Sequence, residues 1–145
     1  MNFLASMGDQ FSKDERSRLM SKIKSVWTSP ERKIHNLLKG NKIRHKMHPK
    51  LPGNPDVYLT DYNTVVFIDG CFWHNCPIHG HIPKSNMEYW EKKIRRNVER
   101  DEAYTAHLRY VGYNVVRIWE CEVSSRDFNF QVFIQNVKTA HNKFR

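Results

Sequence analysis

The residues that most constrain the fold are Val65-Val66-Phe67-Ile68, a continuous apolar run between Thr64 and Asp69. Such a run, followed by a turn signal at Gly70, is typical of a strand that is buried on both faces of a sheet. Segment 64–69 therefore predicts the central strand of the protein.

The segments around this strand follow the order helix, three strands, helix, strand, helix. Three successive strands favour a meander, and a long helix before the last strand favours a crossover. A capping-box pattern marks two helix starts, at Thr28–Glu31 and at Ser85–Glu88. The sequence thus predicts an α/β fold with a mixed central sheet flanked by helices. The predicted helices span 28–40, 87–111 and a segment around 130–137, and the predicted strands span 42–47, 56–60, 64–69 and 113–120.

Charge is unevenly distributed along the chain. The 145 residues contain 24 Lys and Arg against 15 Asp and Glu, a net charge of +9. Residues 1–50 contain 12 of these cations and 4 of the acids, whereas residues 51–83 contain three Asp and no Lys or Arg. A basic surface attracts a polyanion such as DNA, and carboxylates with no cation nearby suit divalent metals. A nuclease needs both the basic surface and the carboxylates. The alternative is that the basic composition only keeps the protein soluble.

Other features of the whole chain exclude several classes of protein. No apolar run is long enough for a membrane span, and the first ten residues lack the basic start of a secretory signal. Three cysteines cannot all pair within one chain, which argues against a secreted disulfide scaffold. We therefore expect a soluble intracellular protein with a basic N-terminal arm or helix, residues 1–27, followed by one domain, residues 28–145.

Three cysteines and a histidine have a spacing that fits a metal site, Cys71-x4-Cys76-x2-His79 with Cys121 at the end of the predicted fourth strand. Zn²⁺ binds thiolate and imidazole tetrahedrally, and a closed set of four ligands is structural. His81 could replace His79, and the alternative is three thiols that bind no metal. Because residues 70–86 are a loop with little apolar content, a metal would order them, and we predict a structural zinc site.

Two aspartates are placed to share a Mg²⁺ ion. Asp56 begins the predicted second strand and Asp69 ends the third, so antiparallel pairing would bring them together. The pair resembles the Pro-Asp…(Asp/Glu)-x-Lys signature of restriction-endonuclease-like nucleases, but Cys71 occupies the Lys position. His74 is then the candidate for proton transfer. Each aspartate could instead be an ordinary turn residue, and His74 a zinc ligand or a plain loop residue.

Four motifs together resemble the very-short-patch repair (Vsr) DNA mismatch endonucleases, with compatible spacing from about Ser17 to Val123. The motifs are Leu51-Pro52-Gly53-Asn54-Pro55-Asp56, Gly70-Cys71-Phe72-Trp73-His74, Asn97-Val98-Glu99-Arg100-Asp101 and Trp119-Glu120-Cys121. The resemblance implies a restriction-endonuclease-like αβββαβ core with catalytic Mg²⁺ and one structural zinc. It implies a strand-specific endonuclease that nicks 5′ of the mispaired thymine at T:G mismatches, which arise when 5-methylcytosine deaminates.

The resemblance also implies roles for individual residues. Asp56 would be the central Mg²⁺ ligand, joined by the backbone carbonyl of Ile68 and by Asp69, whose position is His in some relatives and Asp in others. His74 would be the general acid or base, and Glu31 and Asp101 would support the site. The implied zinc ligands are the four residues named above, Cys71, Cys76, His79 and Cys121.

Several aromatic and basic residues match DNA contacts of the family. Phe72, Trp73 and Trp90 would wedge into the major groove beside the mismatch, and the basic helix predicted in residues 12–25 would reach the minor groove. We expect Phe72 and Trp73 to be exposed, whereas Trp90 could also be a core residue of its helix. The complete set of implied DNA contacts is Met20, Lys22, Phe72, Trp73, Trp90, Lys93 and Arg96.

The implied partner is double-stranded DNA that contains a mismatch. A functional link to a cytosine-5 DNA methyltransferase and to general mismatch-repair proteins is also implied, in the bacterial cytoplasm, and one asymmetric lesion favours a monomer. Two alternatives stay open: a restriction-type endonuclease of the same fold that acts on paired DNA, and a non-catalytic, zinc-stabilised DNA-binding module.

Overall fold

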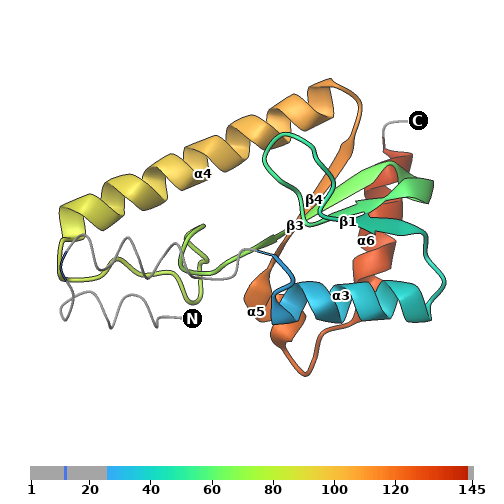
Figure 1. Ribbon diagram of the computed structural model, residues 1–145, viewed down its shortest axis with the longest axis horizontal. Helices are drawn as coiled ribbons and strands as arrows, with labels where there is room; N and C mark the ends of the chain where they lie inside the picture. The colour runs from blue at the N-terminus through green and yellow to red at the C-terminus, as the bar shows by residue number, and fades with distance from the viewer. Residues whose placement is uncertain (1–11, 13–25, 144–145) are drawn as a thin grey trace.

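The computed structural model describes Ser12 and residues 26–143 of the protein, and it has the predicted alternation of helices and strands (Figure 1). Two short elements were not predicted from the sequence, the 3-10 helix η1 and the helix α5 that follows the last strand. The order is α3 (Ser29–Gly40), β1 (His45–Met47), β2 (Val57–Leu59), η1 (Thr60–Tyr62), β3 (Thr64–Asp69), α4 (Met87–Tyr110), β4 (Asn114–Trp119), α5 (Glu120–Ser124) and α6 (Phe130–Asn142).

The four strands form one mixed sheet in the order β1-β2-β3-β4. β2 pairs antiparallel with both β1 and β3, which confirms the meander. β4 then pairs parallel with β3, with Thr64 opposite Asn114 and Asp69 opposite Trp119, and α4 makes the crossover between them. The prediction of an α/β fold with a mixed sheet flanked by helices is therefore confirmed.

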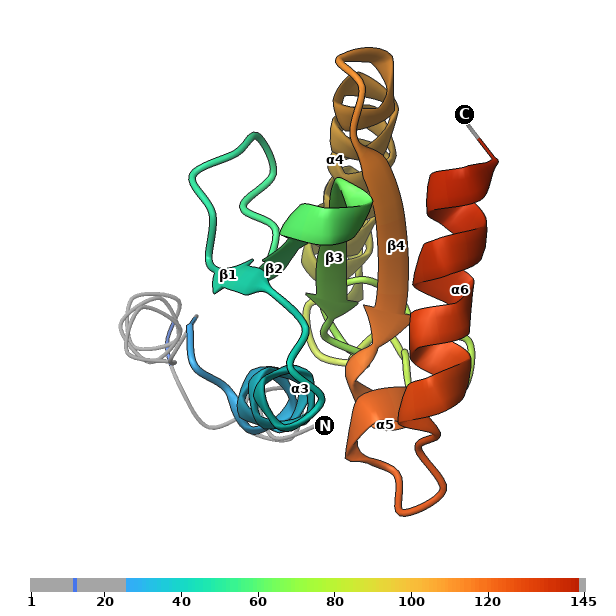
Figure 2. The ribbon, with the colours of Figure 1, turned by 90° about the vertical axis from the view of Figure 1, so that its right-hand side faces the viewer.

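β3 is buried on both faces of the sheet, as its apolar run predicts. Val66 belongs to a core cluster with Ile34 and Leu38 of α3 and with apolar residues of α6. Val65 and Phe67 point to the other face, where they pack with Leu108 of α4. Figure 2 shows α4 behind the sheet and α6 alongside β4. The end of β3 thus lies between two packed layers, which fixes the residues that follow it.

The two predicted capping boxes have different outcomes. At the start of α3 the backbone N–H of Thr28 donates to Glu31 Oε2 at 3.2 Å, and both bonds of the box are present. At α4 the residue before the helix is Asn86, in the left-handed conformation and without a side-chain capping bond, so the box predicted from Ser85 is wrong. The first box orients the Glu31 carboxylate.

α4 extends beyond the sheet and packs against the loop of residues 70–86 (Figure 1). Phe72 of this loop forms a third, separate core cluster with Trp90 and Ile94 of the helix. Near its other end, α4 closely approaches Gly53, which has φ +82° and lies where a Cβ atom would meet Tyr104 at 2.9 Å. Glycine at this position therefore lets the 48–56 segment run close to α4.

Within the described part of the chain, no helix has both the length and the apolar content that a membrane span requires. The N-terminal DNA-binding helix predicted for residues 12–25, with Met20 and Lys22, lies outside the described residues except for Ser12. The division of the chain at residue 27 stays a prediction.

Candidate metal centres and active site

Three groups of metal-ligating side chains lie around the end of β3 and the loop that follows it. In each group the ligand atoms lie within 4.8 Å of one another among the described residues. The groups are Cys71, Cys76, His79 and Cys121; Glu31, His48 and Asp56; and Asp69, His74 and Asp101.

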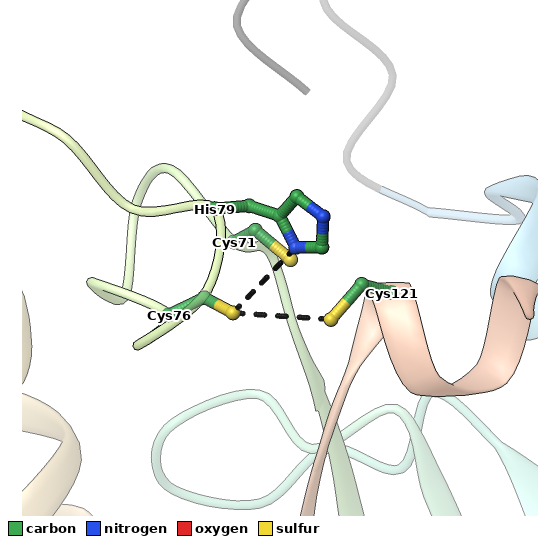
Figure 3. A group of neighbouring side chains, drawn as sticks. All are labelled: Cys71, Cys76, His79 and Cys121. Atoms are coloured by element: carbon green, nitrogen blue, oxygen red, sulfur yellow. Dashed lines mark hydrogen bonds between the residues drawn. The ribbon is translucent and has the colours of Figure 1, made fainter.

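The cysteine group contains all four predicted zinc ligands (Figure 3). Cys76 Sγ lies 3.8 Å from Cys121 Sγ and 4.0 Å from His79 Nδ1. Tetrahedral bonds of about 2.3 Å to one Zn²⁺ would place two sulfurs about 3.8 Å apart, so the donor set fits a four-coordinate metal. A disulfide would need about 2.05 Å, and all three cysteines are free.

Local structure decides which residues join this group. Cys121 lies in the first turn of α5, directly after β4 rather than within it. The backbone N–H of Cys76 donates to the carbonyl of Cys71, and that of Gly80 donates to Cys76, which folds the loop around the ligands. His81 packs instead against the Phe72 ring, so the structure places His79 in the group.

The environment favours a thiolate at one position of the group. Burial opposes ionisation of Cys76, but hydrogen bonds from the backbone N–H groups of His79 and Ile78 outweigh it and lower the pKa of Cys76 to about 6. Burial raises the pKa of Cys71 to about 12. A cation at the centre would stabilise all of the thiolates, because metal binding requires deprotonated ligands.

The second group surrounds Asp56, just before β2. Asp56 Oδ2 accepts a hydrogen bond of 2.6 Å from the backbone N–H of Ile68 on β3. His48 Nε2 lies 2.8 Å from Glu31 Oε2, and Glu31 is buried. Burial raises the pKa of Asp56 to about 8; the Ile68 hydrogen bond opposes the rise, and the Glu31 carboxylate adds to it. Two carboxylates and an imidazole thus converge in a site that favours an additional positive charge.

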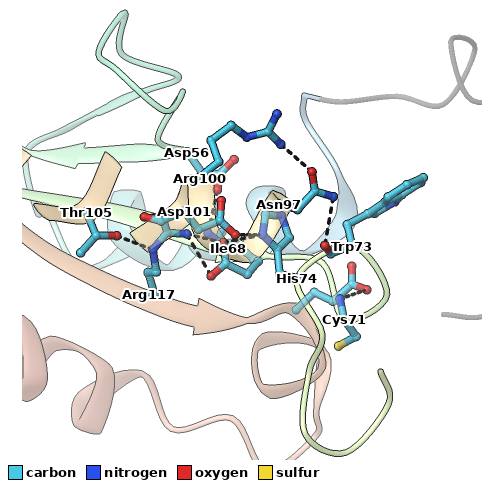
Figure 4. A network of polar contacts seen from close by, with 12 residues as sticks. Asp56, Ile68, Cys71, Trp73, His74, Asn97, Arg100, Asp101, Thr105 and Arg117 are labelled. Carbon is cyan, nitrogen blue, oxygen red and sulfur yellow. Dashed lines mark hydrogen bonds and ion pairs between the residues drawn. The ribbon is translucent and has the colours of Figure 1, made fainter. Parts of the chain in front are cut away.

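The third group surrounds His74, in the loop after β3 (Figure 4). His74 Nδ1 is hydrogen-bonded to the Asp101 carboxylate of α4 and lies 3.9 Å from Asp69 Oδ1. Burial raises the pKa of Asp69, while the Arg117 guanidinium and His74 oppose that rise. A cavity of about 600 Å³ opens beside this group, between α4 and β4.

The two aspartates that were predicted to share a metal fall into different groups. Asp69 ends β3 and faces His74, whereas Asp56 faces Glu31 and His48. His48 and Arg117 were not identified as site residues from the sequence. Arg117 carried a signal, because it is a charged residue inside an apolar strand. His48 carried little, because its contact with Glu31 depends on how α3 packs.

The predicted DNA-contacting aromatic residues are less exposed than expected. Phe72 is 3% exposed and Trp90 is fully buried, and Trp73 is half-buried beside them. The expectation that Phe72 is exposed is therefore wrong in this structure, because its ring packs edge-on against both tryptophans. Their predicted DNA contacts are not tested by this packing. Arg96 on α4 is exposed and Lys93 is half-buried.

Hydrogen bonds connect this aromatic cluster to the site. Asn97 of α4 donates to the backbone carbonyl of Trp73 at 3.2 Å, and Arg100 donates to Asn97 at 2.8 Å (Figure 4). The backbone N–H of Cys71 donates to Glu120 at 3.1 Å. The loop that carries Trp73 and His74 is thus held from both α4 and α5.

Comparisons with known proteins find similarity over most of the chain. The family model described as "DNA mismatch endonuclease Vsr" matches residues 8–79. The chain is 42% identical over 123 residues, 83% of its length and 87% of the relative's, to the type II nicking enzyme V.NmeAIP of Neisseria meningitidis. It is 40% identical over 121 residues, 81% and 88% of the two chains, to the type II nicking enzyme V.XorIIP of Xanthomonas oryzae. It is 35% identical over 127 residues, 83% and 79% of the two chains, to the DNA mismatch endonuclease Vsr of Escherichia coli.

Proposed function

Because the chain belongs to the Vsr family of DNA mismatch endonucleases, we propose that this DNA endonuclease nicks one strand 5′ of the mispaired thymine at T:G mismatches. The observation that carries the proposal is the position of His74. Its imidazole is hydrogen-bonded to Asp101, and it lies in the loop that follows β3. The end of β3 also provides Ile68, whose backbone N–H donates to the Asp56 carboxylate. A carboxylate centre and a hydrogen-bonded imidazole therefore lie near the end of β3. The order of the strands, a meander followed by a parallel β4, supports a restriction-endonuclease-like core.

Asp56 is proposed as the central ligand of a Mg²⁺ ion, with the backbone carbonyl of Ile68 beside it. The donor set fits, because carboxylate and carbonyl oxygens are the ligands that Mg²⁺ prefers. Glu31, buried at the start of α3, adds negative charge on the same side. When bound, the ion would polarise the phosphodiester and stabilise the leaving oxygen.

His74 is proposed to transfer the proton. Its Nδ1 is occupied by the Asp101 carboxylate, which selects the tautomer with a proton on Nδ1 and leaves Nε2 to exchange a proton with the reacting groups. Water would attack phosphorus in line with the leaving oxygen, giving 5′-phosphate and 3′-hydroxyl ends. Asp69, predicted as a further metal ligand, lies on the His74 side of the site.

The cysteine group is proposed as a structural zinc centre. Its four residues would fill the tetrahedral shell of one ion and leave no position for substrate, as in structural sites. A bound ion would join the 70–86 loop to α5, and would so help to keep His74 next to Asp101. We propose Zn²⁺ here and Mg²⁺ at Asp56 because thiolates are soft ligands and carboxylates are hard.

The proposed substrate is mismatch-containing double-stranded DNA, bound by the basic residues 1–27 and by α4. Lys92 and Arg95 of α4 pair with Glu88 and Glu91, whereas Arg96 has no ion pair among the described residues. A monomer acting in the cytoplasm, with a linked cytosine-5 methyltransferase, stays part of the proposal.

A cleavage panel tests this function. End-labelled duplexes that contain T:G, other mismatches or only paired bases would be incubated with the full chain and Mg²⁺. We expect one nick, in the thymine strand of the T:G duplex, and none in the paired control.

A second candidate function is supported by the names of two relatives, which are called type II nicking enzymes. On that alternative the protein would nick fully paired DNA at a defined sequence. Equal cleavage of T:G and paired duplexes of one sequence would favour it over the mismatch function.

A further inference from the structure

Arg117 lies in the middle of β4, between apolar neighbours, and is only partly exposed. In the parallel register it is opposite Phe67 of β3, and its guanidinium lies 3.9 Å from the centre of the Phe67 ring. A charged side chain in such a position loses hydration, and it needs several hydrogen bonds to compensate.

The guanidinium of Arg117 donates to acceptors on two other elements (Figure 4). Nη1 donates to both carboxylate oxygens of Asp69, at 2.8 and 3.1 Å. Nε donates to Thr105 Oγ1 at 2.8 Å, and Nη2 donates to the backbone carbonyl of Asp101 at 3.2 Å. One side chain thus links β3, β4 and α4, and the planar guanidinium fixes the directions of these bonds.

The two acidic residues beside His74 are the ones that Arg117 holds. Asp101 binds His74 Nδ1 through its carboxylate and Arg117 through its backbone, while Asp69 Oδ1 lies 3.9 Å from His74 Nδ1 and 2.8 Å from Arg117. Arg117 itself makes no bond to His74 among the described residues. Its influence on the imidazole must therefore pass through these two residues.

We propose that Arg117 is a positioning residue of the active site, which orients His74 by fixing Asp69 and Asp101 around it. This inference rests on the proposed function of His74. It also places Asp69 with the imidazole rather than with the Mg²⁺ ion, because the guanidinium already binds both oxygens of Asp69 and would repel a dication there. Asp56 is then the carboxylate that serves the metal.

The test replaces Arg117 by Met, which has a similar length but no hydrogen-bond donor, and by Lys, which retains the charge but not the planar fork. Arg126→Met is the matched control, because Arg126 is exposed in the turn between α5 and α6, away from the proposed site. We expect Arg117→Met to lower kcat for T:G nicking about 100-fold, as misplacement of a catalytic group does, with KM within about threefold. Arg117→Lys should recover part of kcat, and Arg126→Met should leave it unchanged.

Imidazole ¹⁵N chemical shifts of His74 in the DNA-free protein give a readout that does not depend on activity. The wild type and Arg126→Met should show one tautomer, protonated on Nδ1, whereas Arg117→Met should show a mixture of tautomers. Thr105→Val, which removes only one acceptor of Arg117, should show a smaller change in the same direction. This milder variant keeps the inference testable if Arg117→Met does not fold.

Two results would overturn the inference: an unchanged kcat in folded Arg117→Met, or an unchanged His74 tautomer in both Arg117→Met and Thr105→Val. Failure of the proposed function is a separate result. If the wild type nicks no duplex, the mismatch-endonuclease function fails, while the ¹⁵N comparison still decides whether Arg117 positions His74.

Discussion

The Asp56 carboxylate accepts a 2.6 Å hydrogen bond from the backbone N–H of Ile68, although burial raises the pKa of the same carboxyl to about 8. The bond comes from β3, the strand that is most completely covered by other elements. The carboxylate that we assign to the metal is thus hydrogen-bonded to the most buried strand of the sheet. Because it is poorly solvated, its charge is balanced best by a bound cation.

This relationship predicts how stability without Mg²⁺ depends on pH. The pKa of Asp56 is raised in the folded state from 3.8 to about 8, so the folded protein binds the extra proton more tightly than the unfolded chain. The stability that Asp56 contributes is complete below about pH 4 and is lost as the pH rises through about 8. Asp56→Asn removes this titration. The difference in melting temperature, variant minus wild type, should therefore increase as the pH rises. Thermal unfolding of both proteins from about pH 5 to 9, in Mg²⁺-free buffer without a chelator, measures this, and parallel curves would contradict it.

The proposed zinc centre predicts that removal of one cysteine thiol lowers both the zinc content and the thermal stability. Cys121→Ser removes a ligand that joins the 70–86 loop to α5, so the purified protein should lose its one equivalent of zinc. Its melting temperature should fall by on the order of 10 °C, which corresponds to a few kcal/mol for a domain of this size. Metal analysis and calorimetry of the same sample check both effects. The pair His79→Ala and His81→Ala is the control: only the first should lose zinc, and zinc loss in the second alone would mean that His81 is the ligand.

His48 is expected to support the site although the family resemblance assigns it no role. Its imidazole lies 2.8 Å from the buried Glu31 carboxylate. His48→Gln should lower nicking about tenfold or more, because it removes the imidazole that holds Glu31 beside the proposed metal ligand Asp56, and loss of an outer partner has about that effect. The neighbouring His45→Gln is the control, because His45 contacts His35 and the carbonyl of Ile43 rather than Glu31. Equal rates for His48→Gln and the control in single-turnover assays would show that His48 has no such role.

The burial of Trp90 predicts that its substitution lowers the stability of the fold, an effect that can be measured separately from DNA binding. Its ring is fully buried against Phe72 and Trp73, so Trp90→Ala should cost about 3–5 kcal/mol of unfolding free energy. The adjacent Tyr89 is exposed, and Tyr89→Ala should cost much less. Urea unfolding measures both. If Trp90→Ala is as stable as the wild type but binds T:G duplex less tightly, then Trp90 acts mainly on DNA, as the resemblance implies.

Parts of the fold were predictable because their causes are local. The apolar run at 65–68 and the capping box at Thr28 act within a few residues, and both are present in the structure. The cysteine group was also predictable, because three cysteines and a nearby histidine are a ligand set typical of one metal site.

The features that were missed depend on tertiary packing. α5 is a helix of five residues that packs against α3, too short for any periodicity to indicate it. Glu31 and His48 meet only in the folded chain, because one lies on α3 and the other directly follows β1. Phe72 is part of a polar loop, and its burial follows from the extension of α4 beyond the sheet.

The most direct test of the active site compares the wild type with Asp56→Ala on one end-labelled T:G duplex. Single-turnover nicking with Mg²⁺ and equilibrium binding of the same duplex would be measured side by side. We expect Asp56→Ala to bind the mismatch within a few-fold of the wild type and to produce no detectable nick. Mg²⁺-dependent nicking by Asp56→Ala at the wild-type rate would contradict the assignment of Asp56 as the centre of a DNA-cleaving site.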